Sequence, residues 1–486
     1  MSGSIEPVRG MRDMLPPEYA AQAAAIGRIE RVLELHGYAP IDVPIIEQRD
    51  LYSRKLGEEL VGKVYEFAFG GRDLVLRPEM TASVLRAYVA RLQDQPAPLR
   101  LRYAGPVFRY ERPQRLTYRQ FTQVGVELIG AAPPRADAEC IALACAGLAA
   151  AGVAAFRVRI GHIGLVRAML GALGLTERSQ GVLLWSLERM RTGGIEGVRM
   201  RLNAGGGAPF DAALLEGIDD RTAEGLLLHS LREIGVNLRF GTRPPEEIVG
   251  RLVRKLRRDD PQPRIDRALA VLAELSGIHG PAEAAIAQAE ALLASAGLPA
   301  AALDELRTVI RLVAAHGVAA ELLDVDFGIG RGLHYYTGPI FEIYDATGMQ
   351  LCGGGRYDDL VTALGGRQAT PAVGFAYGIE RVVAAAAPPA PAPTAAILVA
   401  ASDDDSHPYA LEVARRLRAA GHAVCVDVRQ RSVAANLRDA VRRDAAALVL
   451  VGAEECARGE VVWRDLASRH ERRIVLDELA HGAPDA

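Results

Sequence analysis

GPVFRYERPQRLTYRQFTQVGVELIG, residues 105–130, places two apolar, β-prone segments on either side of a charged stretch. This pattern predicts two long antiparallel strands joined by a basic loop. Because side chains alternate between the two faces of a strand, Gln123, Gly125 and Glu127 share one face of the return strand. We therefore expect a polar ligand on this face, with Glu127 accepting a hydrogen bond from a cationic or NH-bearing group.

Positive charge gathers around the turn of the same stretch. It comes from Arg109, Arg112, Arg115 and Arg119. A guanidinium group presents a planar fork that matches phosphate oxygens, which makes this turn a candidate anion site. The alternative is a solvated hairpin loop with ordinary cross-strand pairs.

A second candidate site lies in GIGRGLHYYTGPIFEIY, residues 328–344. Arg331 stands among glycines, which let a backbone approach a ligand closely. We expect a strand here, in which the adjacent Tyr335 and Tyr336 place one ring on each face. The alternative is a glycine-rich turn with a tyrosine simply packed in the core.

The third candidate combines CGGGRYDDL, residues 352–360, with TPAVGFAYGIERVV, residues 370–383. The triple glycine indicates a crowded backbone beside a ligand. GFAYGIERVVAAA predicts a final helix that carries Arg381 and has glycine at its start. The sequence contains neither GxxxxGK[ST] nor GxGxxG in a strand-turn-helix context, so it does not support P-loop or Rossmann nucleotide binding.

Alternating Ala and Pro, AAAAPPAPAPTA at residues 384–395, predict an extended spacer between two parts of the chain. After it, residues 396–486 alternate short apolar strands with amphipathic helices, which predicts a parallel sheet covered by helices. The expected strands are ILVAA, HAVCVDV and ALVLVG, and the expected helices span 407–420 and 433–443.

The larger part, residues 1–383, mixes both patterns. Strand-like segments occur at YAPIDVPII, DLVLRP, LRLRYAGPVFRY and FTQVGVELIG, and the first helix is expected near Pro17. Residues from about 170 to 319 then show helical Leu/Ala/Arg/Glu periodicity. Strand patterns resume at LLDVDFGIG, HYYTGPIFEIYD and MQLCGGGRYDDL. A sheet that is interrupted by a helical insertion and then completed is an α+β arrangement.

Composition excludes several classes of protein. The chain has 486 residues and a formal charge of −3, so no global basic field drives unspecific nucleic-acid binding. It lacks a charge-free apolar run of about 18 residues, and its N-terminus carries charges where a signal peptide needs apolar residues. We therefore expect a cytoplasmic protein with no membrane partner. Its five cysteines show no zinc-ligand spacing, so no motif predicts a protein-bound metal.

Taken in order, these segments resemble the signature motifs of class II aminoacyl-tRNA synthetases. YAPIDVPIIEQ around Pro44 resembles motif 1, FRYERPQ motif 2 and AVGFAYGIERVV motif 3. RGLHYYTGPIFEIY and GGGRYDDL are similar to the two histidine-specific signatures of histidyl-tRNA synthetases, and the similarity extends to PVRGMRDMLPPE and the tail. The resemblance implies an α+β class II catalytic domain, an antiparallel sheet flanked by helices, over residues 1–383. It also implies a mostly helical insertion at about 170–319 and an α/β domain of the anticodon-binding type at 396–486.

The resemblance also implies a reaction. L-Histidine attacks the α-phosphate of ATP to form histidyl-adenylate, and the acyl group then passes to the 3′-terminal ribose of tRNA(His). Arg109 and Arg331 would neutralise the α-phosphate as catalytic residues, while Arg109 and Arg381 would bind ATP together with Mg²⁺.

The family's histidine site implies further roles. Glu79, Thr81 and Gln123 would receive the α-ammonium group, while Glu127 and Tyr336 would address the imidazole nitrogens. The implied histidine-binding set also includes Arg331 and Tyr335. Arg112 and Gln114 would contact the tRNA acceptor end, and the family implies a homodimer formed through the motif 1 region.

Two alternatives remain open because the sequence departs from the family at Leu116, Thr117 and His334. QVGVELIG and RVRIGHIGLVRAM are similar to the synthetase-like regulatory subunit of ATP phosphoribosyltransferase, which senses histidine without charging tRNA. The other alternative is a synthetase paralogue with a different acceptor. Three retained arginines, Arg109, Arg331 and Arg381, favour the enzyme, because a sensor needs no α-phosphate clamp. The tail favours it too, with helix arginines for phosphate contacts at Arg415, Arg416, Arg418, Arg438, Arg442 and Arg443.

Overall fold

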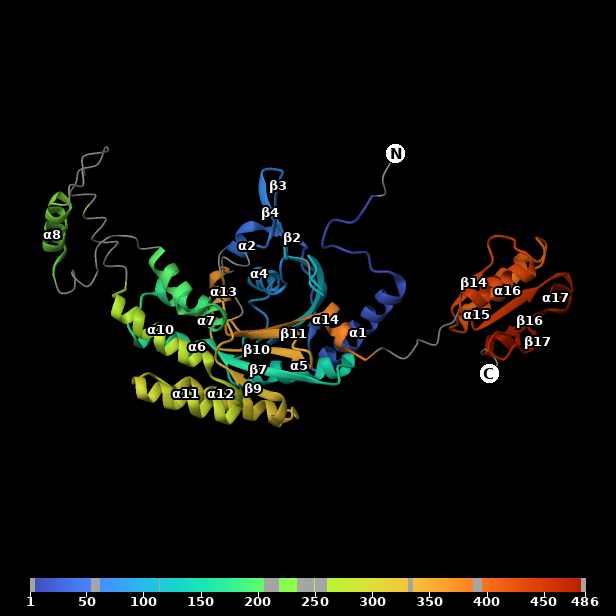
Figure 1. Cartoon of the computed structure of the whole chain (residues 1–486). Helices are drawn as coiled ribbons and strands as arrows, with labels where there is room; N and C mark the ends of the chain where they lie inside the picture. The colour runs from blue at the N-terminus through green and yellow to red at the C-terminus, as the bar shows by residue number, and fades with distance from the viewer. Residues whose placement is uncertain are drawn as a thin grey trace. The chain divides into compact units, whose positions relative to one another are not determined.

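A computed structural model describes residues 5–53, 62–112, 114–204, 218–233, 249, 260–330, 335–387 and 396–481. The chain forms two compact units, Met1–Ala387 and Pro388–Ala486 (Figure 1). Each unit is described by itself. No helix in these described residues is long and apolar enough to cross a membrane.

A nine-stranded sheet forms the centre of the first unit. Its strand order is β1-β5-β6-β12-β11-β10-β7-β9-β8. The strands are β1 (Ala39–Pro40), β5 (Leu99–Phe108), β6 (Gln120–Ile129), β12 (Ala372–Gly378), β11 (Gln350–Arg356), β10 (Pro339–Asp345), β7 (Phe156–His162), β9 (Leu323–Asp326) and β8 (His279–Pro281). Neighbouring strands are antiparallel except for the parallel pairs β1/β5 and β7/β9. The expected antiparallel sheet is therefore confirmed, with two parallel pairs added.

The hairpin predicted from residues 105–130 is confirmed. Strands β5 and β6 pair antiparallel, with Tyr103 opposite Gly125 and Leu101 opposite Glu127. Val124, Val126 and Leu128 point to the opposite face of β6 from Gln123 and Glu127, and they join the main apolar core. The alternation that was read from the sequence thus separates a polar face from a core face.

The prediction that GFAYGIERVVAAA is entirely helical was wrong. Its first half belongs to β12, which pairs with β6 on one side and β11 on the other. Helix α14 begins only at Ile379 and ends at Ala385. A strand in the middle of a sheet is buried on both faces and reads as a short apolar run, so periodicity does not separate it from a buried helix.

The predicted strand through Tyr335 and Tyr336 was also wrong. Strand β10 begins at Pro339, so the alternation of faces does not apply to the two tyrosines. Their rings lie side by side with centroids 4.8 Å apart, and both side chains are buried.

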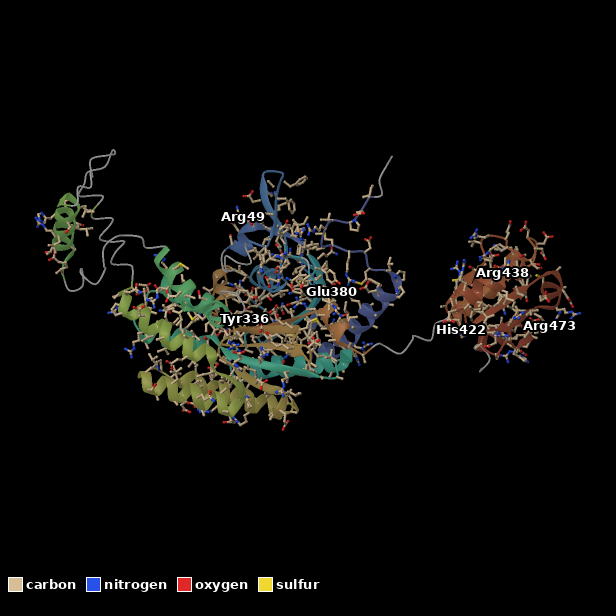
Figure 2. The ribbon with its side chains drawn as sticks, in the orientation of Figure 1. Arg49, Tyr336, Glu380, His422, Arg438 and Arg473 are labelled. Carbon is tan, nitrogen blue, oxygen red and sulfur yellow. The ribbon has the colours of Figure 1, made fainter. Side chains whose placement is uncertain are left out.

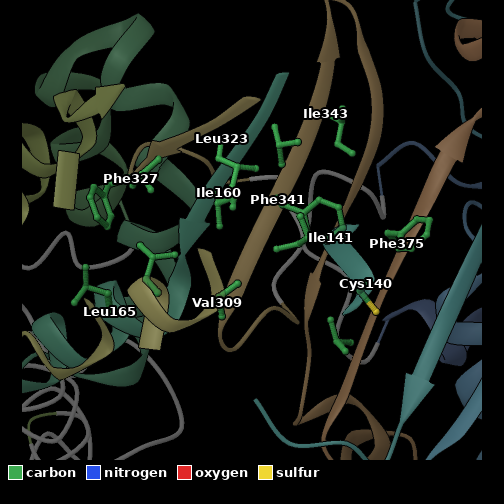
Figure 3. Packing of buried hydrophobic residues seen from close by; sticks show 14 of the residues in the cluster. Cys140, Ile141, Ile160, Leu165, Val309, Leu323, Phe327, Phe341, Ile343 and Phe375 are labelled. Carbon is green, nitrogen blue, oxygen red and sulfur yellow. The ribbon is translucent and has the colours of Figure 1, made fainter. Parts of the chain in front are cut away.

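Helices α1 (Pro16–Leu35) and α5 (Arg135–Ala151) pack together with α14 over one face of the sheet. Figure 3 shows the apolar core that they close, where Phe341 and Phe375 meet edge to face at 6.2 Å. Helix α4 (Thr81–Arg91) and the short α13 (Leu360–Ala363) belong to a second cluster, on the other face, together with Tyr103 and Tyr336. Gln123 and Glu127 lie on that second face, opposite the core residues Val124, Val126 and Leu128.

The first unit also contains a small antiparallel sheet, with strand order β2-β4-β3. Its elements are β2 (Ile46–Gln48), β3 (Tyr65–Phe69) and β4 (Arg72–Leu76), with helix α2 (Arg49–Ser53) following β2. In place of the single strand predicted over YAPIDVPII, the chain forms the two short strands β1 and β2, because proline residues interrupt backbone pairing.

Helices occupy most of the described residues between β7 and β9. They are α6 (Ile163–Ala172), α7 (Glu177–Ala204), α8 (Asp220–Glu233), α10 (Gln262–Gly277), α11 (Ala282–Ala296), α12 (Ala301–Ala315) and the 3₁₀ turn η2 (Ala320–Leu322). Arg191 of α7 fastens this region to the sheet through a salt bridge of 2.5 Å to Asp326 of β9.

The second unit is built on a five-stranded sheet in the order β14-β13-β15-β16-β17. Strands β13 (Ile397–Ala401), β14 (Val424–Val426) and β15 (Ala447–Val451) are parallel, as predicted. The sequence did not predict β16 (Glu460–Asp465) and β17 (Glu471–Val475), which pair antiparallel, so the sheet is mixed. The helical elements are α15 (His407–Ala419), α16 (Val433–Arg442), α17 (Ala453–Arg458) and η3 (Glu478–His481). Helices α15 and α16 contribute to separate apolar clusters with alternate residues of β13, so they cover its two faces.

Candidate active site

A cavity of about 140 Å³ opens on the sheet where β6, β11 and β12 meet the loop after β5. Two residues of helix α14, Glu380 and Arg381, also line it. The lining residues are Arg109, Glu111, Leu116, Thr117, Tyr118, Phe121, Gln123, Gln350, Leu351, Cys352, Gly353, Ala376, Tyr377, Gly378, Glu380 and Arg381. The structure therefore brings together two predicted ATP-binding arginines that are separated by more than half of the chain.

Both arginines are held in place by backbone oxygens. Arg109 donates from Nε to Pro78 O at 2.8 Å, and its guanidinium lies 5.4 Å from the centroid of the Phe121 ring. Arg381 donates to Leu116 O at 3.3 Å and to Gln350 O at 3.2 Å. A cavity with two fixed cations and an aromatic ring suits a planar ligand that carries anionic groups.

Sequence reasoning missed three residues of this cavity: Glu111, Phe121 and Glu380. Phe121 lies two positions before Gln123 in the same strand, so the alternation already used for Gln123 and Glu127 was the signal for it. Glu380 accepts a hydrogen bond from Thr122 N at 2.8 Å, and burial raises the pKa of its carboxyl group. It is labelled in Figure 2.

A second group of polar side chains surrounds Glu127, which is fully buried, and we name this buried polar group the Glu127 pocket. Its Oε1 accepts a hydrogen bond from Tyr103 Oη at 3.1 Å. Within the described part of the chain, three buried polar atoms of this pocket have no partner: Glu127 Oε2, Tyr357 Oη and Gln123 Oε1. Buried polar groups are normally hydrogen-bonded, so three such atoms on one face of the sheet indicate a polar ligand.

The charge of this pocket favours a cationic or NH-bearing ligand. Burial raises the pKa of Glu127 well above its usual value, while hydrogen bonds from Thr81 and Tyr103 oppose that rise and the charge of Glu79 adds to it. Glu79 is also buried, and its pKa is raised by burial and held back by the amide of Ala82 and the charge of Arg109. Two neighbouring buried carboxyl groups repel each other, and a bound cation relieves that repulsion.

Glu79 has a structural task as well. Its carboxylate accepts hydrogen bonds from Thr81 N at 2.7 Å and Ala82 N at 2.9 Å, at the start of helix α4. The helix N-terminus therefore fixes the position of this carboxylate beside the pocket.

Three tyrosines pack at the side of the Glu127 pocket. Tyr335 lies 5.6 Å from Tyr357 between ring centroids, and Tyr336, labelled in Figure 2, lies 6.4 Å from Tyr357. Gly355 is needed for this packing, because a Cβ at that position would lie 2.9 Å from Tyr336 Cδ1. Tyr357 was not predicted as a site residue, since its partners converge from distant strands.

Two predicted site residues lie outside both the cavity and the Glu127 pocket. Arg112 and Gln114 are exposed in the loop between β5 and β6, where Thr117 N donates to Gln114 O at 3.0 Å. Arg331 and His334 lie outside the described residues.

The arginine of GGGRYDDL proves to be structural. Arg356 is buried and binds Asp137 at 2.8 Å and Asp358 at 2.9 Å. Of the preceding glycines, Gly353 lines the cavity, whereas Gly354 is packed against the backbone of β12. The crowding inferred from the triple glycine thus arises partly from the sheet itself.

Gly374 lies directly against the partnerless atoms. A Cβ at this position would lie 2.2 Å from Glu127 Oε2, 2.4 Å from Val126 O and 2.5 Å from Tyr357 Oη. We expect Gly374→Ala to weaken binding of histidine, the ligand that the family resemblance implies here, by at least about 100-fold. Isothermal titration calorimetry measures this, with Gly354→Ala as the control. That change also crowds the sheet, against Gly374 O at 2.3 Å and Phe375 Cβ at 2.5 Å, but its three nearest atoms include no polar side-chain atom of the pocket. Unaltered binding in Gly374→Ala would contradict the assignment of the pocket.

Among the described residues, no group of three or more His, Cys, Asp or Glu side chains has the arrangement to hold a metal ion.

The antiparallel sheet, the α/β unit and the arginine-lined cavity define a class II aminoacyl-tRNA synthetase. The chain matches the family model for histidyl-tRNA synthetase over residues 10–215 and 251–382, and the model for an anticodon binding domain over residues 394–483. It belongs to the histidyl-tRNA synthetase family, which confirms the resemblance drawn from its motifs.

Individual relatives agree with this membership. The chain is 30% identical to a histidine–tRNA ligase of Methanocaldococcus jannaschii, over 97% of this chain and 98% of the relative. It is 33% identical to a histidine–tRNA ligase of Pyrobaculum arsenaticum, over 97% of each chain. A solved structure described as an ATP phosphoribosyltransferase regulatory subunit/histidyl-tRNA synthetase from Bacillus halodurans C is 25% identical. It superposes with a TM-score of 0.67 over 93% of this chain and 99% of that one.

Proposed function

We propose that this chain activates L-histidine with ATP and transfers the histidyl group to tRNA(His). One observation carries the proposal. The cavity with Arg109, Phe121 and Arg381 shares Gln123 with the pocket around Glu127, on one face of the sheet. A nucleotide and a polar amino acid bound there would have their reacting groups next to each other.

The first step joins the two ligands. A carboxylate oxygen of histidine attacks the α-phosphorus of ATP, and pyrophosphate leaves with the electrons of the broken P–O bond. Arg109 faces the developing charge on the α-phosphate. Because Pro78 O already fixes Arg109, little reorganisation is needed during the reaction. Phe121 and Arg381 hold the nucleotide from the two sides of the cavity.

Histidine selection rests on the Glu127 pocket. The imidazole N–H donates to Glu127 Oε2, and Tyr336 and Tyr357 lie beside the ring. Glu79, Thr81 and Gln123 receive the α-ammonium group, and Tyr335 packs behind them. Arg331 is assigned to the α-phosphate and the histidine carboxylate by family resemblance alone.

Magnesium would arrive with the nucleotide. Glu111 and Glu380 line the cavity that also contains Arg109. Carboxylate oxygens are the ligands that Mg²⁺ prefers, and the ion usually bridges one or two of them to phosphates. The donor set therefore fits Mg-ATP, and the ion would supply further neutralisation of phosphate charge.

Transfer to tRNA needs contacts outside the cavity. Arg112 and Gln114 are exposed on the loop and are available for the acceptor end. In the second unit, Arg415 and Arg416 pair with Glu412, and Arg442 and Arg443 pair with Asp439. Arg418 donates to Val424 O at 2.9 Å. Arg438 of helix α16 therefore becomes the first choice among the predicted phosphate contacts (Figure 2).

A homodimer through the motif 1 region agrees with the surface there. Ile45 and Ile46 are 42% and 49% exposed, and a cavity of about 380 Å³ opens beside Pro44 and Arg86. Exposed apolar side chains beside a hollow are typical of a surface that another chain covers. The proposed function places the protein in the cytoplasm, with tRNA as its partner.

Histidine-dependent exchange between pyrophosphate and ATP tests the first step. We expect exchange in the wild-type chain and a loss of about 100-fold in Arg109→Ala, since one charge-stabilising donor contributes about that much. Arg367→Ala is a matched control, because it removes only an exposed pair of 2.7 Å with Asp94. It should retain full exchange.

The alternatives give different results in the same assay. A histidine sensor binds histidine but shows no exchange, which would refute the synthetase proposal. A paralogue with another acceptor shows exchange but does not charge tRNA(His).

A further inference from the structure

The segment Val8–Arg12, which we name the N-terminal strap, lies against the loop between β5 and β6. Arg119 N donates to Gly10 O at 2.8 Å, and Arg119 Nη1 donates to Arg9 O at 2.9 Å. A turn closes the strap itself, with Met11 N donating to Val8 O at 2.8 Å. More than 100 residues of sequence separate the strap from Arg119, so these contacts are tertiary.

Gly10 makes the close approach possible. Its φ is +85°, in the left-handed region that favours glycine. A Cβ at this position would lie 2.7 Å from Arg119 Cδ and 2.9 Å from its Cγ. Any other residue here would displace the Arg119 side chain or the strap.

Arg119 connects the N-terminal strap to residues that line the nucleotide cavity. Its Nε donates to Glu111 O at 3.2 Å, and its guanidinium lies 3.9 Å from the centroid of the Tyr110 ring. Its carbonyl oxygen accepts from Arg109 N at 2.9 Å. Arg109 and Glu111 both line the cavity, so Arg119 contacts the strap as well as two cavity-lining residues.

Arg12 provides a second, independent link. Its guanidinium lies 4.3 Å from the centroid of the Tyr118 ring, and it pairs with Glu18 of helix α1. Tyr118 and Glu380 line the cavity. Burial chiefly raises the pKa of the Glu380 carboxyl group, and the positive charge of Arg12 opposes that rise, so Arg12 acts electrostatically on the cavity wall.

We infer that the N-terminal strap is a positioning element of the nucleotide site, in which Gly10 seats Arg119 and Arg12 holds Tyr118. Gly10 and Arg12 are positioning residues, because their contacts reach the cavity through other side chains. The contacts described above touch the ATP side of the site and none of the residues around Glu127. The strap therefore sets ATP affinity and leaves histidine affinity unchanged. This inference rests on the proposed function for the identity of the nucleotide.

Gly10→Ala tests the seat of Arg119. We expect the KM for ATP in pyrophosphate exchange to rise about 10-fold, with the KM for histidine and kcat within about two-fold of wild type. Gly37→Ala is the matched control. Gly37 has a φ of +80°, and no atom lies within 4 Å of the position that a Cβ would take. The Gly37→Ala substitution therefore introduces the same backbone strain without the clash. An equal rise in both variants, or an unchanged KM for ATP in Gly10→Ala, would overturn the inference.

Arg12 variants keep the test decisive if Gly10→Ala fails to fold. Arg12→Gln removes the cation above Tyr118, and we expect the KM for ATP to rise about 10-fold, whereas Arg12→Lys keeps a cation there and should recover most of the affinity. Equal ATP affinity in wild type and Arg12→Gln would refute the role of Arg12.

Calorimetric titration of ATP without histidine separates this inference from the proposed function. A wild-type chain that binds ATP without exchange would defeat the proposed function. The ATP Kd values of the same variants would still decide whether the strap positions the site.

Discussion

Replacing Glu127 with Ala is expected to lower kcat/KM for histidine by about 1,000-fold, because the change removes the acceptor on which histidine selection depends. Glu127 is fully buried and has one carboxylate oxygen bound by Tyr103 and the other without a partner. Deleting it leaves both Tyr103 Oη and the imidazole N–H of the substrate without an acceptor in a site that excludes water. Each such loss is costly, since a buried donor without a partner gives up its full hydration.

Exchange kinetics with varied histidine measure this loss, and calorimetry with ATP shows whether the nucleotide site survives. Glu127→Gln retains a carbonyl oxygen, so an intermediate loss is expected. Glu139→Ala is a matched control, because Glu139 also accepts a hydrogen bond from a tyrosine, Tyr38 Oη at 3.0 Å, but lies outside both pockets. It should lose stability without losing histidine affinity. Normal histidine kinetics in Glu127→Ala would contradict the assignment of Glu127 to the imidazole.

The sequence predicted one wall of this pocket and not the others, for a physical reason. Alternation along a single strand placed Gln123 and Glu127 on one face, and the structure agrees. The other walls come from separate strands. Tyr103 lies in β5, Tyr357 directly follows β11, and Gly374 lies in β12, so no local pattern connects them. They converge only because β6 lies between β5 and β12 in the sheet.

Two of the errors in secondary structure, at β12 and at Tyr335 and Tyr336, have the same origin. β12 is buried on both faces, so its apolar run resembled the start of the helix that follows it. For Tyr335 and Tyr336, the alternating pattern assumed a strand that begins only at Pro339. In both places the tertiary setting decides the conformation, and the local sequence is compatible with either choice.

The roles of individual arginines were the least predictable feature. Arg109, Arg381 and Arg356 all stand near glycines or turns in motifs that resemble family signatures. Arg109 and Arg381 line the cavity, whereas Arg356 forms a buried ion pair. Its partner Asp137 lies 219 residues away in sequence, so spacing gave no indication of the pairing.

The buried pair gives the second large effect: Asp137→Ala is expected to lower the free energy of unfolding by about 3–5 kcal/mol. Both side chains are 2% exposed, and Arg356 donates to Asp137 from Nε at 2.9 Å and from Nη2 at 2.8 Å. Burial raises the pKa of Asp137, and the hydrogen bonds and charge of Arg356 oppose that rise. Removing Asp137 leaves the buried guanidinium with Asp358 and Ala131 O as its remaining acceptors.

Urea unfolding of the full chain, followed by circular dichroism, measures the change. Asp94→Ala is the control, because its pair with Arg367 has the same chemistry and a length of 2.7 Å, but side chains that are 84% and 62% exposed. Exposed pairs contribute about 0–1 kcal/mol, so the control should stay close to wild type. The double variant Asp137→Leu/Arg356→Met should recover most of the lost stability, because it also removes the buried guanidinium that Asp358 alone would otherwise have to compensate. If the double variant is no more stable than Asp137→Ala, the loss does not come from a poorly compensated charge, and the pair instead acts by fixing the backbone at Arg356 and thus the position of the adjacent Tyr357.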